Sequence, residues 1–176
     1  MIRKVSSSLT TFKEVDLTAN FNIILADRTK DSTKKDTRNG LGKSTFIDVI
    51  HFCLGGKVTS ASSRLWHPML SQYEFSLEFE LNGKIFSVTR RLDNPTFVTL
   101  AGDVSDLPLP EDRGKKSARL SVSDWTRFLG QYWLGVPVDT DRKYAPSFRS
   151  VISYFIRSDK DAFNDPFRHF RVQPSW

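Results

Sequence analysis

The chain of 176 residues contains a single cysteine, Cys53, and only two methionines. One cysteine cannot form an intrachain disulfide or a cysteine metal cluster, so the fold must depend on its apolar core. No apolar run approaches the roughly 20 residues of a membrane-spanning helix, and Met1-Ile2-Arg3-Lys4-Val5 lacks the apolar stretch of a signal peptide. The sequence therefore predicts a soluble cytoplasmic protein in which Cys53 is a small buried side chain.

The charged residues are biased towards the basic but are not concentrated in one place. Lysine and arginine number 26 against 20 acidic residues, which gives a net charge of +6 and no dense basic run. Such a surface permits nucleic-acid binding without requiring it. Hydrophobic residues make up 39% of the chain and include 14 phenylalanines, so we expect one globular domain with an aromatic core.

The most specific chemical pattern is a glycine-rich loop, Asn39-Gly40-Leu41-Gly42-Lys43-Ser44-Thr45, that runs directly into an apolar segment. Glycines in such a loop allow successive backbone N–H groups to point at a phosphate. The lysine then reaches the β- and γ-phosphates, and the serine hydroxyl binds Mg²⁺. A helix that begins here adds the positive end of its dipole. We therefore expect the phosphates of a nucleotide along this loop, with Lys43 on the phosphates and Mg²⁺ on Ser44.

The entry into this loop is unusual. In the common pattern Gly-x₄-Gly-Lys-Ser/Thr, the first glycine lies five positions before the second. Counting back five positions from Gly42 gives Thr37. A charged, lysine-rich insertion at 27–38 separates the loop from the strand expected before it. The simpler interpretation of this insertion is a mobile surface loop, and the alternative is a contact for a partner.

Hydrophobic periodicity predicts strands before and after the loop. Residues 21–26 are a short apolar run, as expected of a strand that is buried on both faces. Residues 73–81 alternate between apolar and polar, Asn82-Gly83 is a strong hairpin-turn signal, and 84–92 is the expected partner strand. A third strand is expected at 96–100. We therefore predict an α/β fold with a mixed sheet that contains an antiparallel meander.

The apolar segment after the loop, 46–54, predicts a mostly buried helix that ends at Gly55-Gly56. His51 on this helix has no second histidine or acidic cluster nearby in the sequence, so we expect an internal partner for it and not a metal.

The remaining regular elements are predicted by capping residues and apolar spacing. Ser121 or Ser123 can begin a second helix whose aromatic residues have helical spacing, and Gly135 ends it. We expect these aromatic side chains in the core. Residues 2–7 predict a first strand, and 148–156 predict a further helix or strand.

Three segments together resemble the N-terminal head lobe of SMC-like ATPases, the ABC-type ATPases of chromosome maintenance and double-strand-break repair. The segments are Phe21-Asn22-Ile23-Ile24, the glycine-rich loop, and Phe46-Ile47-Asp48-Val49-Ile50. The loop entry Asp36-Thr37-Arg38-Asn39-Gly40 is most similar to an uncharacterised bacterial branch of that family. The resemblance implies a P-loop NTPase lobe that binds ATP and Mg²⁺, with residues 11–13 on the adenine side.

The resemblance also implies that half of the active site comes from elsewhere. Hydrolysis needs a carboxylate to orient water, and Mg²⁺ needs an acidic partner. Asp103 and Asp159 are the nearest candidates, but neither directly follows its apolar run, and Ser158 stands where the Q-loop glutamine is expected. The chain has no Ser-Gly-Gly signature and no heptad pattern. The resemblance thus implies that 1–176 is the N-terminal lobe of a longer chain.

This interpretation carries expectations about partners and function. The C-terminal lobe of the same chain would complete the ATPase, ATP would bring two heads together as a homodimer, and DNA is a possible partner in repair, maintenance or defence. No membrane partner is expected.

Two alternatives stay open on sequence grounds. A self-contained P-loop kinase would clamp phosphates with Arg157, Arg168 and Arg171, although it would need an acidic base and a lid that we cannot identify. A non-catalytic nucleotide-binding module would agree with Thr37 and Ser158. For the leading interpretation we expect the chain alone to hydrolyse ATP scarcely or not at all.

Overall fold

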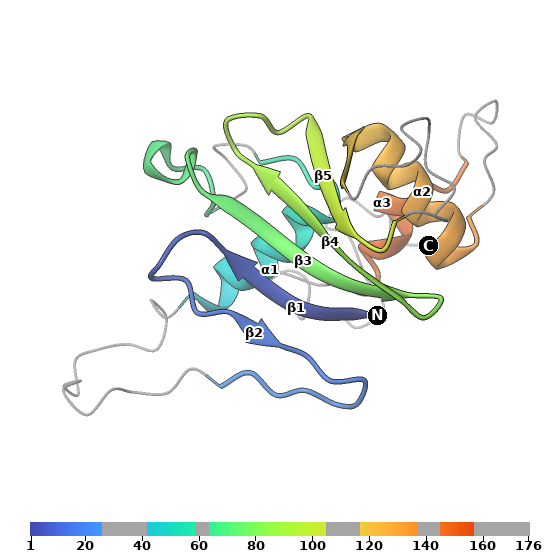
Figure 1. Ribbon diagram of the computed structural model, residues 1–176, viewed down its shortest axis with the longest axis horizontal. Helices are drawn as coiled ribbons and strands as arrows, with labels where there is room; N and C mark the ends of the chain where they lie inside the picture. Colours follow the sequence, from blue (N-terminus) through green and yellow to red (C-terminus); the bar gives the residue numbers. More distant parts are fainter. Residues whose placement is uncertain (26–41, 59–63, 105–116, 137–144, 157–176) are drawn as a thin grey trace, which may run out of the picture.

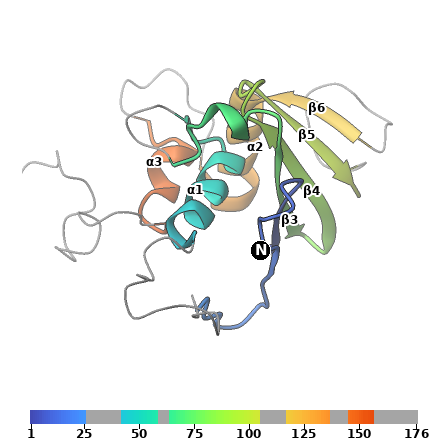
Figure 2. The same ribbon diagram turned by 90° about the vertical axis from the view of Figure 1, so that its left-hand side faces the viewer.

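The structure is a computed structural model that describes residues 1–25, 42–58, 64–104, 117–136 and 145–156. It contains one sheet whose strands are β1 (Ile2–Ser7), β2 (Val15–Asp16), β3 (Glu74–Leu81), β4 (Lys84–Arg91), β5 (Phe97–Gly102) and β6 (Ser117–Ser121). The helices are α1 (Lys43–Cys53), α2 (Val122–Leu134) and α3 (Phe148–Ile152), with a short 3₁₀ helix, η2 (Pro68–Leu70). The strand order is β2-β1-β3-β4-β5-β6, and α1, α2 and α3 lie on one face of the sheet (Figures 1 and 2).

The central hairpin forms where the alternating pattern predicts it. Strands β3 and β4 pair in register from Glu74 opposite Arg91 to Leu81 opposite Lys84. Asn82 and Gly83 in the turn have φ values of 52° and 77°, which the preferred two-residue hairpin turn requires at both positions. The alternate residues of both strands face the helices and are buried. The predicted hairpin and the third strand after it are confirmed.

The strand predicted at 21–26 is wrong for this structure. Residues 21–25 form no strand, and the side chains of Phe21 and Leu25 are 87% and 81% exposed. An apolar strand buried on both faces needs neighbours in a sheet and layers above and below it. The described part of the chain does not supply these neighbours to 21–25. The six described strands also pair only antiparallel, so the α/β class is confirmed but the expected mixed sheet is not.

The core lies between the sheet and the helices and is aromatic, as predicted. Trp125 of α2 is completely buried, with its ring in edge contact with Phe79 of β3 and Phe86 of β4 at centroid distances of 5.9 and 6.4 Å. Burial of such a side chain contributes about 1.5–3 kcal/mol. The Ser121 hydroxyl accepts a hydrogen bond from the Asp124 amide and begins α2, and Gly135 ends it with φ of 63°. The predicted second helix is therefore confirmed, including its caps.

Candidate functional site

The end of the glycine-rich loop forms the amino end of α1. Gly42 adopts the left-handed conformation (φ 78°), and the helix begins at Lys43. The Gly42 carbonyl accepts the first helical hydrogen bond, from the Phe46 amide at 2.8 Å. Gly42, Lys43 and Ser44 are exposed. The structure therefore presents Lys43 and Ser44 to solvent on the first turn of a helix, while Asn39, Gly40 and Leu41 lie outside the described residues.

This amino end carries positive potential. Within the described part of the chain, no side chain caps it, and the first turn holds no acidic residue. The first N–H groups of a helix lack intrahelical acceptors, and the helix dipole adds about half a positive charge. Lys43 brings a further cationic group to the same turn. The arrangement can bind an anion such as a phosphate, and the Ser44 and Thr45 hydroxyls could serve a bound cation.

The carboxyl end of α1, in contrast, is buried, and its backbone groups have hydrogen-bond partners. Cys53 and Leu54 are completely buried there, and their carbonyl groups are used. The Trp125 indole donates to the Cys53 carbonyl at 2.9 Å, and the Gly56 amide donates to the His51 carbonyl at 2.7 Å. Buried carbonyl groups at a helix end must find donors. This end is therefore fixed by the protein itself, and the predicted burial of Cys53 is confirmed.

Arg90 of β4 is the main donor at this fixed end. Its side chain is 3% exposed and donates to the carbonyl groups of Phe52, Gly56 and Pro95. The guanidinium carbon lies 4.0 Å from the centre of the Phe52 ring. Burial lowers the pKa of Arg90 from 12.5 to about 10. The negative end of the α1 dipole and these carbonyl groups take the place that a carboxylate usually has beside a buried arginine.

Arg149 of α3 reaches the same helix end more loosely. One of its N–H groups donates to the Leu54 carbonyl at 3.5 Å, and the other lies 3.4 Å from His51 Nδ1. The side chain is half-buried, and burial lowers its pKa. His51 therefore has the internal partner that the sequence predicts. No group of three or more potential metal ligands occurs among the residues that the structure describes.

Other predicted site residues are placed elsewhere. The exposed Asp103 follows β5, and its carboxylate lies 3.6 Å from the Lys84 ammonium. Phe12, expected on the adenine side, is partly buried and packs edge-on against the core residue Phe75 at 6.4 Å, whereas its neighbours in 11–13 are exposed. The remaining predicted features lie outside the described residues: Thr37, the insertion 27–38, Arg157, Ser158, Asp159, Arg168 and Arg171.

Sequence reasoning did not identify Arg90 and Arg149 as anchors of α1. A signal for Arg90 exists, because it continues the buried alternation of Phe86 and Val88 in β4. An arginine at an apolar position indicates a buried partner of opposite polarity. Arg149 has no comparable sequence signal, since its partners are backbone and ring atoms about a hundred residues earlier.

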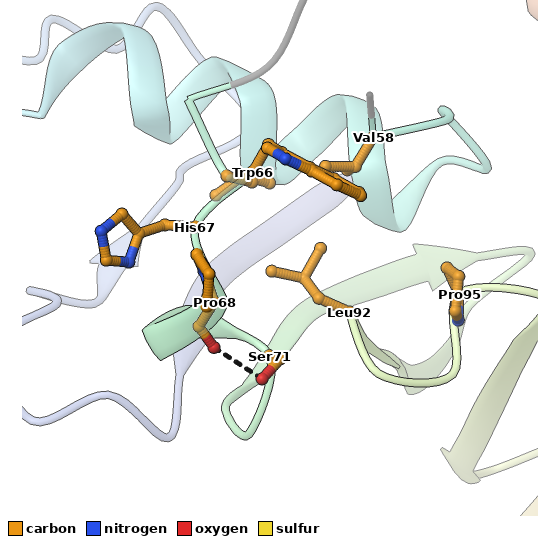
Figure 3. Close-up of a pocket in the computed structure, with 8 residues that line it drawn as sticks. Val58, Trp66, His67, Pro68, Ser71, Leu92 and Pro95 are labelled. Carbon is orange, nitrogen blue, oxygen red and sulfur yellow. Dashed lines mark hydrogen bonds between the residues drawn. The ribbon is translucent and has the colours of Figure 1, made fainter. Parts of the chain in front are cut away.

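A cavity of about 210 Å³ lies beside α1 and is lined by side chains from the segment that follows it and from the β4–β5 turn (Figure 3). Its described lining residues are Val58, Leu65, Trp66, His67, Pro68, Ser71, Leu92 and Pro95. The described lining residues include no Asp, Glu, Lys or Arg. The Ser71 hydroxyl donates to the Pro68 carbonyl, and His67 Nδ1 accepts from the Met69 amide. The cavity is mainly apolar and therefore suits an apolar group better than a phosphate.

Comparison with known proteins assigns the chain to no family. No family model matches the chain, and no solved structure matches it. The chain is 27% identical over 144 residues to the uncharacterized protein YydD of Bacillus subtilis (strain 168), a match that covers 82% of the chain but only 22% of that protein. The chain thus spans about a fifth of this relative's length.

Among the described residues, no helix is long and apolar enough to cross a membrane.

Proposed function

We propose that this chain binds ATP and Mg²⁺ with the loop Asn39–Thr45 and the first turn of α1. The observation that carries this proposal is the exposed amino end of α1, which bears Gly42, Lys43 and Ser44 in chain order and which no side chain of the described residues caps. In this proposal the backbone N–H groups hold phosphate oxygens, Lys43 neutralises the β- and γ-phosphates, and Ser44 binds Mg²⁺. The anchored carboxyl end keeps the helix in place while its other end binds the ligand.

We further propose that the chain is the N-terminal lobe of a longer SMC-like ATPase. The exposed apolar residues of 21–25 support this, because side chains such as Phe21 and Leu25 need a covering partner. A match that spans only 22% of a relative agrees with a longer protein. In this proposal a C-terminal lobe supplies the acidic and signature residues, ATP joins two heads, and the assembly hydrolyses ATP in DNA repair, maintenance or defence.

The binding proposal is tested by titrating ATP into the purified chain with and without Mg²⁺, using calorimetry. We expect weak binding that Lys43→Ala abolishes and that Ser44→Ala makes insensitive to Mg²⁺. Lys57→Ala is the matched control, because Lys57 is also exposed but lies beyond the fixed end of α1. Equal losses in Lys43→Ala and Lys57→Ala would reduce the effect to general surface charge and contradict the proposed site.

The half-site proposal is tested by the same chain in a turnover assay. We expect scarcely any ATP hydrolysis, because hydrolysis needs a carboxylate that we assign to the other lobe. Steady multiple turnover that Lys43→Ala abolishes would contradict this and favour a self-contained kinase-like enzyme. For the longer protein, sedimentation with and without ATP tests the homodimer, and an unchanged mass would argue against it.

DNA binding by the longer protein is tested through the salt dependence of its affinity. Release of counterions from neutralised phosphates makes that affinity fall steeply with salt. A flat salt dependence would argue against contact with the phosphate backbone.

A further inference from the structure

Three side chains from three different elements hold the fixed end of α1, and one of them differs from the other two. Arg90 of β4 and Trp125 of α2 are fully buried and donate to the carbonyl groups of Phe52 and Cys53. Arg149 of α3 is half-buried, and its two polar contacts are long, at 3.4 and 3.5 Å. Long contacts between partly hydrated groups are weak and are exchanged easily for water. Of these three contacts, that of Arg149 is the one best suited to be made and released.

The Arg149 guanidinium lies close to Gly56, just beyond the end of the helix. A Cβ atom built on Gly56 would lie 3.4 Å from the Arg149 guanidinium and 2.6 Å from the His51 carbonyl oxygen. A Cβ here would clash with the His51 carbonyl and would reach contact distance of the guanidinium, so a glycine leaves the most room at this point. The arginine also approaches a second buried cation, because Arg149 contributes to the lowered pKa of Arg90. A shift of the helix end must therefore move Arg149 or break its contacts.

The helix connects this contact to the proposed nucleotide site. Eleven residues span about 16 Å, so the Arg149 contact and the proposed nucleotide site lie at the two ends of one short helix. Between its ends α1 packs through Val49 and Phe52 against the sheet, so small shifts along its axis are felt at both ends.

We infer that Arg149 is a positioning residue for the phosphate-binding end of α1 and couples nucleotide occupancy at Lys43–Thr45 to the placement of α3. The inference rests on the proposed nucleotide binding. Arg149 adds a third, weaker contact to the carboxyl end that Arg90 and Trp125 already hold. In this inference nucleotide binding restrains the amino end of α1, and the restrained helix keeps its carboxyl end within reach of Arg149. Coupling is reciprocal, so a chain that loses the Arg149 contact also loses nucleotide affinity.

The test measures Mg·ATP affinity together with amide hydrogen exchange in α1 and α3. The variants are Arg149→Gln, which removes the charge and the fork, and Arg149→Lys, which keeps the charge alone. Arg119→Gln is the charge-matched control, because Arg119 is exposed on β6 and lies over the Phe97 ring. In the unmodified chain we expect Mg·ATP to slow exchange in both helices. In Arg149→Gln we expect Mg·ATP to bind about threefold to tenfold more weakly. Mg·ATP should still slow amide exchange in α1 of this variant but should no longer slow it in α3.

The remaining outcomes separate the two proposals. Arg149→Lys should lie between the unmodified chain and Arg149→Gln, and Arg119→Gln should behave as the unmodified chain. A nucleotide that slows exchange in α1 but not in α3 of the unmodified chain would overturn the coupling and leave nucleotide binding intact. Unchanged affinity and an unchanged α3 response in Arg149→Gln, with only a lower melting temperature, would assign Arg149 to stability alone. Absence of ATP binding to the unmodified chain would remove both proposals.

Discussion

The two ends of α1 differ in what satisfies their backbone groups. Any α-helix leaves four N–H groups and four C=O groups without intrahelical partners. At the carboxyl end of α1 the fold supplies donors from β4, α2 and α3, including Arg90 and Trp125. At the amino end, within the described residues, it supplies no side-chain cap, and Lys43 and Ser44 stay exposed. The difference teaches that the groups a fold leaves uncapped are the ones to examine for a ligand.

The largest expected loss comes from removing the aromatic donor at the fixed end. Trp125→Ala deletes a completely buried side chain and the hydrogen bond to the Cys53 carbonyl, so unfolding should become easier by about 3–5 kcal/mol. Denaturant unfolding followed by circular dichroism measures this. Tyr132→Ala on the same helix is the control, because Tyr132 is 44% exposed and should cost much less. Similar losses for both residues would contradict the special role of the fixed end.

A glycine substitution at the fixed end should cost nearly as much, for a steric reason. Gly55 has φ of 88°, and a Cβ there would lie 2.3 Å from Thr126 Cγ2. Backbone strain and the clash together predict a loss of about 2–4 kcal/mol for Gly55→Ala. Thr126→Ser removes Cγ2 but keeps the hydroxyl, so the double variant should recover part of the stability in the same unfolding measurement. No recovery in the double variant would assign the whole loss to backbone conformation.

Much of this architecture can be predicted from the sequence where the signal is local. The β3–β4 hairpin follows from strict alternation and Asn82-Gly83, and both ends of α2 follow from Ser121 and Gly135. These elements satisfy their own backbone and apolar pattern within a few residues of sequence.

The failures have a physical cause in common. The apolar run 21–25 is exposed because burial on both faces depends on partners that its own pattern cannot supply. Strand β6 and the short β2 carry weak patterns and depend on pairing with β5 and β1. For the site, chain order places Lys43 and Ser44 on the first turn of a helix, as observed. The anchors at the other end contact residues 34 to 98 positions away in the sequence, which no local pattern reveals.

The pH dependence of stability should report on the buried carboxyl end through Cys53. Burial raises the pKa of this thiol from 9.0 to about 12, so above pH 9 the unfolded chain loses a proton that the folded chain keeps. The stabilisation that the protonated Cys53 thiol contributes is therefore fully present below pH 9 and is lost progressively towards pH 12. At pH 10 the loss relative to pH 7 should be about 1.4 kcal/mol. The lowered pKa of Arg90 acts in the opposite direction, but only above about pH 10.

Thermal unfolding between pH 7 and pH 10 checks this expectation. Cys53→Ala should be less stable than the unmodified chain at pH 7 but should lose less stability on going to pH 10. Val49→Ala, another completely buried position on α1, should keep the full alkaline loss. Parallel curves for the unmodified chain and Cys53→Ala would show that this thiol does not contribute.

The smallest change in stability is expected at the open end of α1. Gly42 also has a positive φ, but a Cβ there meets no atom within 4 Å. Gly42→Ala should therefore cost only about 1 kcal/mol. Its effect on ATP affinity should be the larger one, because in the proposed site the backbone curls around a phosphate at this residue. A loss of stability equal to that of Gly55→Ala would remove the contrast between the two ends.

The strand order has a consequence for how the chain is made. Strands β4, β5 and β6 each pair with the strand synthesised just before them, so the β3–β6 meander can form as it leaves the ribosome. Strand β1 must wait until β3 has emerged, some 70 residues later, because β3 is its longer partner. Phe21 and its apolar neighbours are synthesised during that interval, and they remain exposed after the sheet has folded. This exposed apolar run is therefore made early, and the folding of the described sheet does not cover it.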